Sequence, residues 1–325
     1  MIRRGLFLLA IFAAVSLFPP VACPAQGESP PPWPVADITF TVPFNSGSET
    51  AALFSLVQDA FAAKTGKAMT ARLVPGRAGA NAWARLVDDA PDGSVLTAVL
   101  LPDAYLRMLQ PDSGVNVDAM GICHVIAYMP AVLWTVTSSS FASVDDVTAA
   151  AAKSDFSAAG PGSYSAGQIA ARSLDRQTGT RSLYVPYSGT VTAAKAAADK
   201  QVQVFWGYSV RVAPPGLDPA SLQPLAVAAP ARLPALPETP TFKELGMTID
   251  EGVHIGVAVP ADTPEITRQE ISEFFAVLAG DSSFRAKAEA LGFVPHNVGL
   301  SDMASFLAEM KESADAKAQD FSLRE

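Results

Sequence analysis

From Ile38 onward the chain alternates short apolar runs with amphipathic stretches, and this alternation limits the fold more than any other feature. Strands are predicted at 38–42, 69–74, 95–100, 131–136, 183–185, 202–206, 225–228 and 255–259. Helices are predicted at 49–64, 81–89, 144–152, 167–177, 190–198, 241–245, 264–278, 282–291 and 301–316. Strands that alternate with helices indicate an α/β protein with mostly parallel sheets, because parallel neighbours need a crossover connection.

Two changes of composition divide the chain into domains. Residues 135–146 become serine-rich after an apolar run, and residues 245–264 return to strand character after a proline-rich loop. We therefore expect an outer α/β domain, 37–141 plus 252–325, and a central α/β domain, 142–251. A chain that crosses twice between domains makes a hinged pair with a cleft. Ligands of open α/β sheets lie beyond the carboxyl ends of the strands, so the cleft is the expected site.

The first 25 residues have the pattern of a secretory signal peptide. Two arginines precede an apolar core that is too short to span a membrane comfortably. We expect cleavage after Ala25, with lipidation at Cys23 as the alternative. A proline-rich segment, 26–36, follows and is predicted to be a flexible leader. The sequence thus predicts an exported, periplasmic protein.

Net charge narrows the range of partners. The full chain has 23 basic and 32 acidic residues, and loss of Arg3 and Arg4 with the signal leaves 21 against 32, a net charge of −11. This balance disfavours nucleic acid and anionic membranes as partners. A small anion would have to be held by local dipoles. Without Cys23, Cys123 has no internal disulfide partner, and its apolar neighbours predict burial.

The first candidate site is the turn in "VPFNSGSET", which begins at Val42. A strand, a turn of small residues and a helix start make an anion cradle, because the first N–H groups of a helix lack internal partners and lie at its positive end. No phosphate-loop lysine or three-glycine fingerprint is present, so a nucleotide is not expected. The alternative is an ordinary capped turn, with Ser46 and Glu49 as a capping box.

Three further turns are candidate ligand sites for similar reasons. "SAAGPGSYSAG" (157–167) contains two glycines that allow close backbone approach, followed by serines that can cap a helix. "VPYSGT" (185–190) ends a strand, and Tyr187 can stack on a ligand or donate to it. "PGRAG" (75–79) places Arg77 where it can pair with a carboxylate, although a solvated surface arginine and a core tyrosine are the ordinary alternatives.

These stretches, in this order, carry a family resemblance. "VPF" (42–44), "PGRAG" to "APDG" (75–93), the two turns above, "LPALPETPTFKELG" (233–246) and "GVAVPADTP" (256–264) span essentially the whole mature chain. The chain resembles the periplasmic solute-binding proteins of tripartite tricarboxylate transporters, the Bug-type receptors.

The resemblance implies a fold and a function. The expected fold is a two-domain periplasmic binding protein of the Venus-flytrap, type II-like class. The expected ligand is a small organic acid, held chiefly by backbone N–H groups and ordered water. The implied partners are the membrane permease subunits of such a transporter, with a sensor role as the alternative. A monomer without a cofactor is expected.

The sequence also departs from the family pattern. Ala51 and Gly207 stand where family members commonly carry acids, which disfavours ligands with an amine. His254 replaces an aromatic residue, and Trp206 and Tyr208 favour an aromatic or longer acid.

The turns and the resemblance together predict a site without catalytic residues, metal ligands or cofactor. Backbone N–H groups are expected to bind the ligand, and a few side chains to select it. The expected ligand contacts are Phe44, Asn45, Ser46, Gly47, Ser48, Arg77, Gly79, Gly160, Gly162, Ser163, Tyr187, Gly189, Thr190, Trp206 and His254.

A secreted serine hydrolase is the alternative function. Ser165, in "SYSAG", is one residue short of a nucleophile elbow, and Asp250 and His296 follow in the order of the α/β-hydrolases. An elbow should follow a strand directly, and here "AAGPG" intervenes. His124 and His254 lie far from each other and from His296 in the sequence, which disfavours a metal site. We therefore expect a binding protein and not an enzyme.

Overall fold

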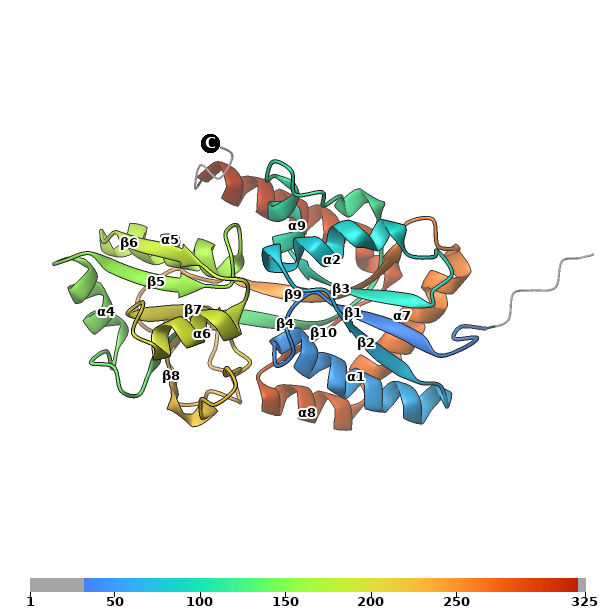
Figure 1. Cartoon of the computed structure of the whole chain (residues 1–325), viewed down its shortest axis with the longest axis horizontal. Helices are drawn as coiled ribbons and strands as arrows, with labels where there is room; N and C mark the ends of the chain where they lie inside the picture. The colour runs from blue at the N-terminus through green and yellow to red at the C-terminus, as the bar shows by residue number, and fades with distance from the viewer. Residues whose placement is uncertain (1–31, 321–325) are drawn as a thin grey trace, which may run out of the picture. The chain divides into compact units, whose positions relative to one another are not determined.

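The computed structural model describes residues 32–320, in which strands and helices alternate (Figure 1). The strands are β1 (Ile38–Val42), β2 (Met69–Leu73), β3 (Val95–Leu101), β4 (Met120–Val136), β5 (Phe156–Gly160), β6 (Ser182–Pro186), β7 (Val204–Tyr208), β8 (Leu222–Val227), β9 (Gly252–Pro260) and β10 (Val294–Val298). The α-helices are α1 (Glu49–Thr65), α2 (Ala80–Arg85), α3 (Asp103–Met108), α4 (Val144–Ala151), α5 (Ala166–Thr178), α6 (Thr190–Ala198), α7 (Glu265–Gly280), α8 (Ser282–Leu291) and α9 (Leu300–Asp320). Short 3₁₀ turns lie at Arg77–Gly79, Leu86–Asp88, Val117–Ala119 and Pro219–Ser221.

The strands form one mixed sheet in the order β2-β1-β3-β9-β4-β7-β5-β6, with β8 and β10 also paired to β4. Parallel pairing, as predicted, joins β1 to β2 and β3, and β5 to β6 and β7. Antiparallel pairing surrounds the centre, where β9 joins β3 and β4, and β4 joins β7, β8 and β10. The α/β class is as predicted, and the sheet is less parallel than expected because β4 and β9 run against their neighbours.

One long strand links two sections of this sheet. β4 has 17 residues: its first part pairs with β9 and β10, and its last part, from Ala131, pairs with β7 and β8. We call the β2, β1, β3, β9 and β10 side the first section, and the β7, β5, β6 and β8 side the second section. The sequence predicted only the last third of β4, because its start is apolar without alternation and is buried on both faces.

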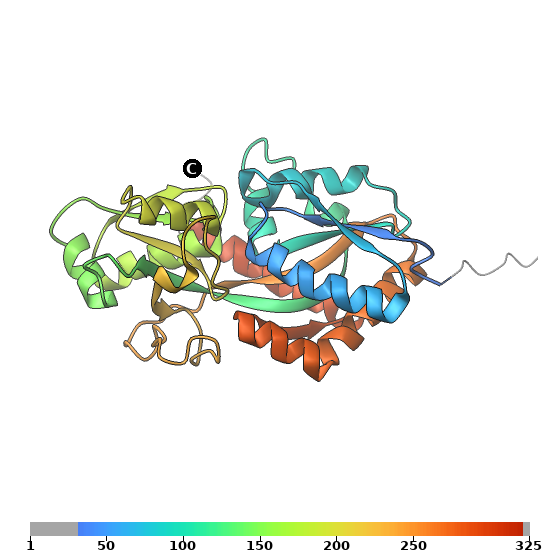
Figure 2. The same ribbon diagram turned by 60° about the horizontal axis from the view of Figure 1, so that its bottom comes forward.

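Helices cover both faces of each section. Around the first section, α1 and α8 lie side by side, as Figures 1 and 2 both show. One apolar cluster fills this section, from Phe61 through Trp83 to Phe275. The second section has a cluster on each face, because β7 directs Trp206 to one face and Phe205 to the other.

Helix boundaries follow from local chemistry. α1 begins at Ser48, whose side chain accepts the N–H of Ala51, and ends at Gly66 with φ +68°. Helices α6 and α8 have the predicted bounds. The helix predicted at 241–245 is wrong, since turns occupy that stretch. Helix α3 and strands β5 and β10 were not predicted.

The segment before β1 is partly anchored. Trp33, placed in the predicted flexible leader, donates its backbone N–H to Glu270 Oε2 at 2.9 Å and its indole N–H to the Gly93 carbonyl at 2.8 Å. Its ring packs edge-on against Phe61 and Phe274. The predicted signal peptide and Cys23 lie outside the described residues. Within 32–320, no helix combines the length and apolar character needed to cross a membrane.

Cys123 lies in the middle of the first section. It is fully buried on β4, and its thiol contacts the Gly121 carbonyl at 3.4 Å. Burial raises the pKa of this thiol to about 12. The predicted burial of Cys123 is therefore confirmed.

Candidate functional site

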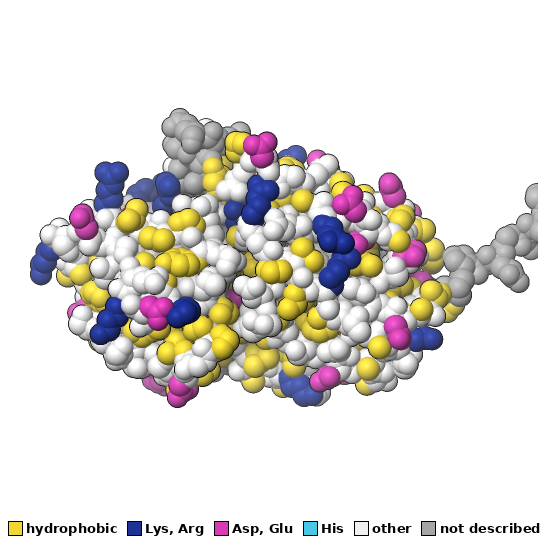
Figure 3. Space-filling view, in the orientation of Figure 1, with side chains coloured by type: hydrophobic (Ala, Val, Ile, Leu, Met, Phe, Trp, Pro, Cys, Tyr) yellow, Lys and Arg dark blue, Asp and Glu magenta, His cyan; other side chains and the backbone are white. Residues whose placement is uncertain are grey.

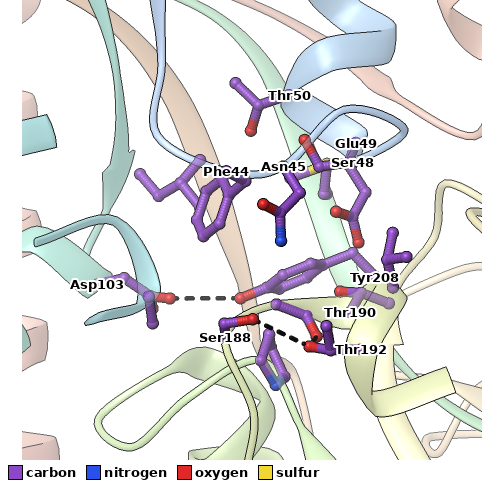
Figure 4. A pocket seen from close by; sticks show the side chains of 16 residues that line it. Phe44, Asn45, Ser48, Glu49, Thr50, Asp103, Ser188, Thr190, Thr192 and Tyr208 are labelled. Carbon is purple, nitrogen blue, oxygen red and sulfur yellow. Dashed lines mark hydrogen bonds between the residues drawn. The ribbon is translucent and has the colours of Figure 1, made fainter. Parts of the chain in front are cut away.

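A pocket lies where strand ends and helix starts of both sections meet (Figure 4). The pocket is narrow, because only about 20 Å³ of it can hold the centre of a water-sized sphere. The first section supplies the α1 start, and the second supplies the α6 start. The lining residues are Phe44, Asn45, Ser48, Glu49, Thr50, Ala78, Leu100, Asp103, Met129, Pro161, Ser188, Gly189, Thr190, Val191, Thr192 and Tyr208.

The turn before α1 forms one wall. Ser48 donates its N–H to the Asn45 carbonyl at 3.2 Å, which closes the turn, and caps the helix with its side chain. Glu49 follows as the first residue of α1 and is only 5% exposed. Its Oε1 atom has no hydrogen-bond partner among the described residues. Figure 4 shows the Asn45 and Glu49 side chains directed toward Thr190 and Tyr208 across the pocket.

Burial governs the protonation of Glu49. Desolvation raises the pKa of its carboxyl, and a nearby Thr190 hydroxyl and the Glu49 backbone N–H lower it by smaller amounts. The Thr190 Oγ1 atom is itself buried and lies outside good hydrogen-bonding geometry with any described group. Glu49 and Thr190 therefore lie close together at the pocket, and neither Glu49 Oε1 nor Thr190 Oγ1 is held in a well-formed hydrogen bond.

The start of α6 forms the opposite wall. Gly189 is the N-cap residue, and no side chain caps this helix. All four residues from Gly189 to Thr192 line the pocket. The N–H groups in the first turn of a helix lack intrahelical partners and carry the positive end of the dipole. This wall is therefore suited to an anion.

The start of α5 is different, because the protein's own groups fill it. Ser165 accepts the N–H of Gln168 at 3.2 Å and donates its hydroxyl to the Gly162 carbonyl at 2.8 Å. Asp103 Oδ1, from α3 in the first section, accepts the N–H of Ala166 at 2.9 Å. A carboxylate thus already occupies this helix start.

Asp103 is a buried acid with several partners. Its Oδ2 accepts the Tyr208 hydroxyl at 3.3 Å. Desolvation raises the pKa of Asp103 to about 7, against the opposing effects of Arg107, the Ala166 N–H, Tyr208 and Lys317.

Arg107 lies one helical turn after Asp103 and is 4% exposed. Its Nη1 donates to Gln110 Oε1 at 3.0 Å, and its Nε and Nη2 have no partner among the described residues. Burial lowers the pKa of its guanidinium, and the Asp103 charge raises it by a smaller amount.

Two turns touch beside the pocket. Gly162 has φ +112°, a left-handed value that favours glycine. A Cβ atom at this position would collide with Ala78 and lie 3.2 Å from Arg107 Nη2. Gly162 therefore allows the turn after β5 to approach the turn around Ala78 in the other section.

Comparison with known proteins identifies the family. Residues 53–321 match the tripartite tricarboxylate transporter family receptor. The chain belongs to this family. A UPF0065 protein of Bordetella bronchiseptica is 21% identical over 315 residues, which cover 95% of this chain and 90% of the relative. A UPF0065 protein of Cupriavidus necator is also 21% identical, with 94% of each chain covered.

Solved structures share the fold of this receptor. R. palustris Rpa4515, a structure with adipate, has a TM-score of 0.80 at 22% identity and covers 88% of this chain and 97% of its own. The periplasmic binding protein BugD has a TM-score of 0.76 at 19% identity, covering 90% and 98%. MatC of Rhodopseudomonas palustris with bound malate has a TM-score of 0.75 at 22% identity, covering 88% and 99%. The predicted periplasmic-binding-protein fold is confirmed.

Five of the predicted contacts lie in the pocket lining of the receptor: Phe44, Asn45, Ser48, Gly189 and Thr190. Ser46 and Gly47 belong to the same turn as the first three, but they are exposed and lie outside the lining. Gly162 and Ser163 are in the neighbouring turn that contacts Ala78, and neither is a lining residue.

Other predicted contacts have different neighbours. The Arg77 guanidinium donates to the backbone carbonyls of Asp112 at 2.7 Å and Ser113 at 3.5 Å. Gly79 packs against Trp83, and Gly160 against Tyr184. The Tyr187 hydroxyl donates to Gln201 at 3.3 Å. None of these four predicted residues lines the pocket.

Two predicted side chains lie in packed regions away from the pocket. Trp206 is 1% exposed and stacks on Phe242 in the core of the second section. The Nδ1 of His254 lies 2.9 Å from the Nδ1 of His296, and its ring packs against Tyr128 and Phe306. Burial, and then His296, lower the pKa of His254 to about 3, so this ring is neutral at pH 7.

Asp103 was not predicted to belong to the site, and Glu49 was predicted only as a capping residue, although both line the pocket. One signal was available for Asp103. It follows the apolar run of β3 within two residues, at the carboxyl end where ligand sites of α/β sheets occur. Helix α3 was not recognised, so its two charged residues were not placed on the sheet edge.

The residues of the alternative hydrolase have other partners. The Ser165 hydroxyl is used by Gly162, Gln168 and Tyr184, while His296 contacts His254. Asp250 is exposed on the segment before β9. No hydrogen bond links these three residues in the part of the chain that the structure describes. Among residues 32–320, no group of three His, Cys, Asp or Glu side chains could hold a metal ion.

Proposed function

We propose that this receptor captures a small organic carboxylate in the pocket between the α1 and α6 starts, outside the cytoplasm. The observation that carries the proposal is the uncapped start of α6, where Gly189 to Thr192 all face the pocket. Membership of the family supports it, and so do the printed ligands, adipate and malate, of two structures with the same fold. Binding requires no covalent step.

Local dipoles resolve the conflict between an anionic ligand and an acidic protein. Figure 3 shows basic and acidic side chains interspersed on the face that it presents. An α-helix start offers several N–H donors and the equivalent of about half a positive charge. The pocket wall at α6 can therefore attract a carboxylate although the mature chain, as predicted, has a net charge of −11.

Movement of two domains would admit the ligand. The pocket is narrow, with about 20 Å³ open to the centre of a water-sized sphere, which suits about one water. A carboxylate of several carbons needs the two walls to separate. We assign the walls to the predicted outer domain, 37–141 plus 252–325, and central domain, 142–251, with the long strand β4 linking the two sections of the sheet.

The proposed cellular setting follows from the family and the N-terminal pattern. Residues 1–25 would direct export to the periplasm, with lipidation at Cys23 as the alternative. A monomer would deliver its ligand to the permease subunits of a tripartite tricarboxylate-type transporter. The alternative partner is a sensor protein that responds to the same movement of the two domains. No nucleic acid is expected as a partner.

Ligand-dependent thermal unfolding and calorimetry test this function. The probes are acetate, propionate, malate, succinate and adipate, with the corresponding uncharged amides as controls. At least one carboxylate should raise the unfolding temperature while its amide does not, since only the ionised group uses the α6 dipole. If carboxylates and amides have equal effects, the proposed anion site is wrong.

A further inference from the structure

The two walls of the pocket differ in electrostatic character. The α6 wall presents the positive end of an uncapped helix. The opposite wall presents two buried carboxyl groups, Glu49 and Asp103, each about 5% exposed. A pocket with a donor-rich wall and an acidic wall is complementary to a ligand that carries both kinds of group.

Glu49 has one weak partner, the Thr190 hydroxyl, which lies close by but is poorly placed for a hydrogen bond. Its Oε1 is unbonded, and the ion pairs within residues 32–320 do not include it. Buried carboxylates are normally paired or hydrogen-bonded, because an isolated buried charge is costly. The Thr190 hydroxyl beside it is also without a well-formed hydrogen bond. A ligand donor that reaches Glu49 Oε1 would supply the missing partner.

Asp103 limits how many carboxylates a ligand can bring. It already accepts the Ala166 N–H at the α5 start and the Tyr208 hydroxyl. A second ligand carboxylate at that helix start would have to displace Asp103 or lie beside it in a site of low dielectric. Like charges this close oppose each other strongly. The α6 start therefore remains as the place for one ligand carboxylate.

We propose that the pocket selects a zwitterion, a small molecule with one carboxylate and one protonated amine. The carboxylate binds at the α6 start, and the ammonium donates to Glu49. This proposal rests on the proposed function and specifies its ligand class. It is the reverse of the expectation drawn from Ala51 and Gly207, because Glu49 and Asp103 supply acids from other positions.

Ion pairing should also change the protonation of Glu49. Burial raises the pKa of this carboxyl, and Tyr208, Asp103 and Thr190 are the polar side chains nearby. A bound ammonium would favour the ionised form. Binding below the raised pKa should therefore release a proton, and the heat of binding should depend on the ionisation enthalpy of the buffer.

Calorimetry with matched acids tests the proposal at pH 7. The pairs are propionate with alanine and with β-alanine, butyrate with 4-aminobutyrate, and succinate with aspartate. At least one single-carboxylate amino acid should bind roughly 30-fold or more tightly than its amine-free partner, the lower end of the effect of a buried charge pair.

Two variants separate the roles of the carboxyl group. Glu49→Gln keeps the shape and a donor but cannot pair with an ammonium, so it should remove that 30-fold preference. The measured quantity is the ratio of the two affinities in each protein, so an effect of the substitution that is common to both kinds of acid cancels. Glu265→Gln is the matched control, because Glu265 is likewise the first residue of a helix but is exposed and outside the pocket. Thermal unfolding of both variants checks their folding.

The outcomes are distinct. If amine-free acids bind as tightly as amino acids and Glu49→Gln keeps their affinity, Glu49 is a protonated donor to an anion and the zwitterion proposal is wrong. The receptor would still be a carboxylate receptor. If neither kind of acid binds, the proposed function itself fails.

Discussion

The starts of α5 and α6 are similar in sequence, but they differ in whether their N–H groups are free to bind a ligand. Each follows a strand of the second section through a turn of small residues, and each was predicted to bind a ligand. At α5, Ser165 caps the helix and Asp103 accepts the Ala166 N–H at 2.9 Å. At α6, the cap is Gly189, and the first turn faces a pocket. A helix start can bind an external anion only where the rest of the fold leaves its N–H groups unused.

This difference arises from distant residues. Asp103 is 63 positions before Ala166 and belongs to a helix of the other section. The turn sequences alone therefore cannot show which helix start is filled. Variants that change the carboxyl group at the α5 start, or add one at the α6 start, test this comparison directly.

The largest expected effect is on stability, from Asp103→Asn. Burial raises the pKa of Asp103 to about 7. Between about pH 4 and pH 7 the folded state therefore binds more protons at this site than the unfolded chain does, and stability falls as pH rises. Asparagine cannot ionise but can still accept the Ala166 N–H. Asp103→Asn should remove a decline of roughly 3 to 4 kcal/mol across this range.

Urea unfolding of both proteins between pH 4 and pH 8 measures this difference. Arg107, Lys317 and Tyr208 act on Asp103 and remain in the variant, so the difference between the curves isolates the Asp103 carboxyl. Parallel curves would mean that burial does not raise the pKa of Asp103.

The second effect is on ligand binding, from Gly189→Asp. Gly189 has φ 168°, an extended conformation open to any residue, and a Cβ there would be 3.7 Å from Phe44 Cδ1. The new carboxylate would cap α6, as aspartate commonly does, and repel a ligand carboxylate. Affinity for the best acid should fall about 100-fold, or roughly 3 kcal/mol.

Gly189→Ala is the control, since it adds the Cβ without an acceptor and should keep wild-type affinity within about threefold. Calorimetry on both proteins measures the effect, and thermal unfolding should show the aspartate variant a few tenths of a kcal/mol more stable. Wild-type affinity in Gly189→Asp would remove α6 from the site.

The third effect is moderate and comes from Ser165→Ala. Loss of this N-cap should lower the free energy of unfolding by about 1 kcal/mol, because the N–H of Gln168 loses its acceptor. Ligand affinity should change by less than about twofold, since α5 is not the proposed anion site. An esterase activity that disappears in this variant would favour the hydrolase alternative.

The smallest effect is expected from Arg77→Ala. This side chain is exposed and anchors the carbonyls of Asp112 and Ser113, outside the pocket lining. Ligand affinity, measured by calorimetry, should stay within about twofold of wild type. A larger loss would mean that Arg77 turns toward the ligand when it binds, and that a side-chain clamp contributes beside the α6 dipole.

Much of the fold could be predicted because hydrophobic periodicity and helix-capping residues are local features of the sequence. The bounds of α6 and α8 were predicted correctly. The first part of β4 was missed because burial on both faces removes the alternation that marks a strand. Helix α3 was missed because its six residues are too few to show a helical period.

The site was less predictable because the position of a side chain along a strand or helix decides which residues surround it. Trp206 and Tyr208 are two residues apart on β7 and point to the same face of the sheet. Trp206 lies under Phe242, whereas Tyr208, at the carboxyl end of the strand, lines the pocket. The alternation of side chains along a strand predicts the face on which each one lies. Which residues cover that side chain is seen only in the folded structure.

The burial of Cys123 makes the receptor a convenient starting point for an optical sensor. A thiol with a pKa of about 12 and no exposed surface reacts very slowly with maleimides at neutral pH. In protein produced without residues 1–25, a cysteine introduced at the exposed rim position Ser188 would then be the one reactive thiol. A polarity-sensitive dye attached there would report occupancy of the pocket, so that unlabelled metabolite mixtures could be screened by fluorescence.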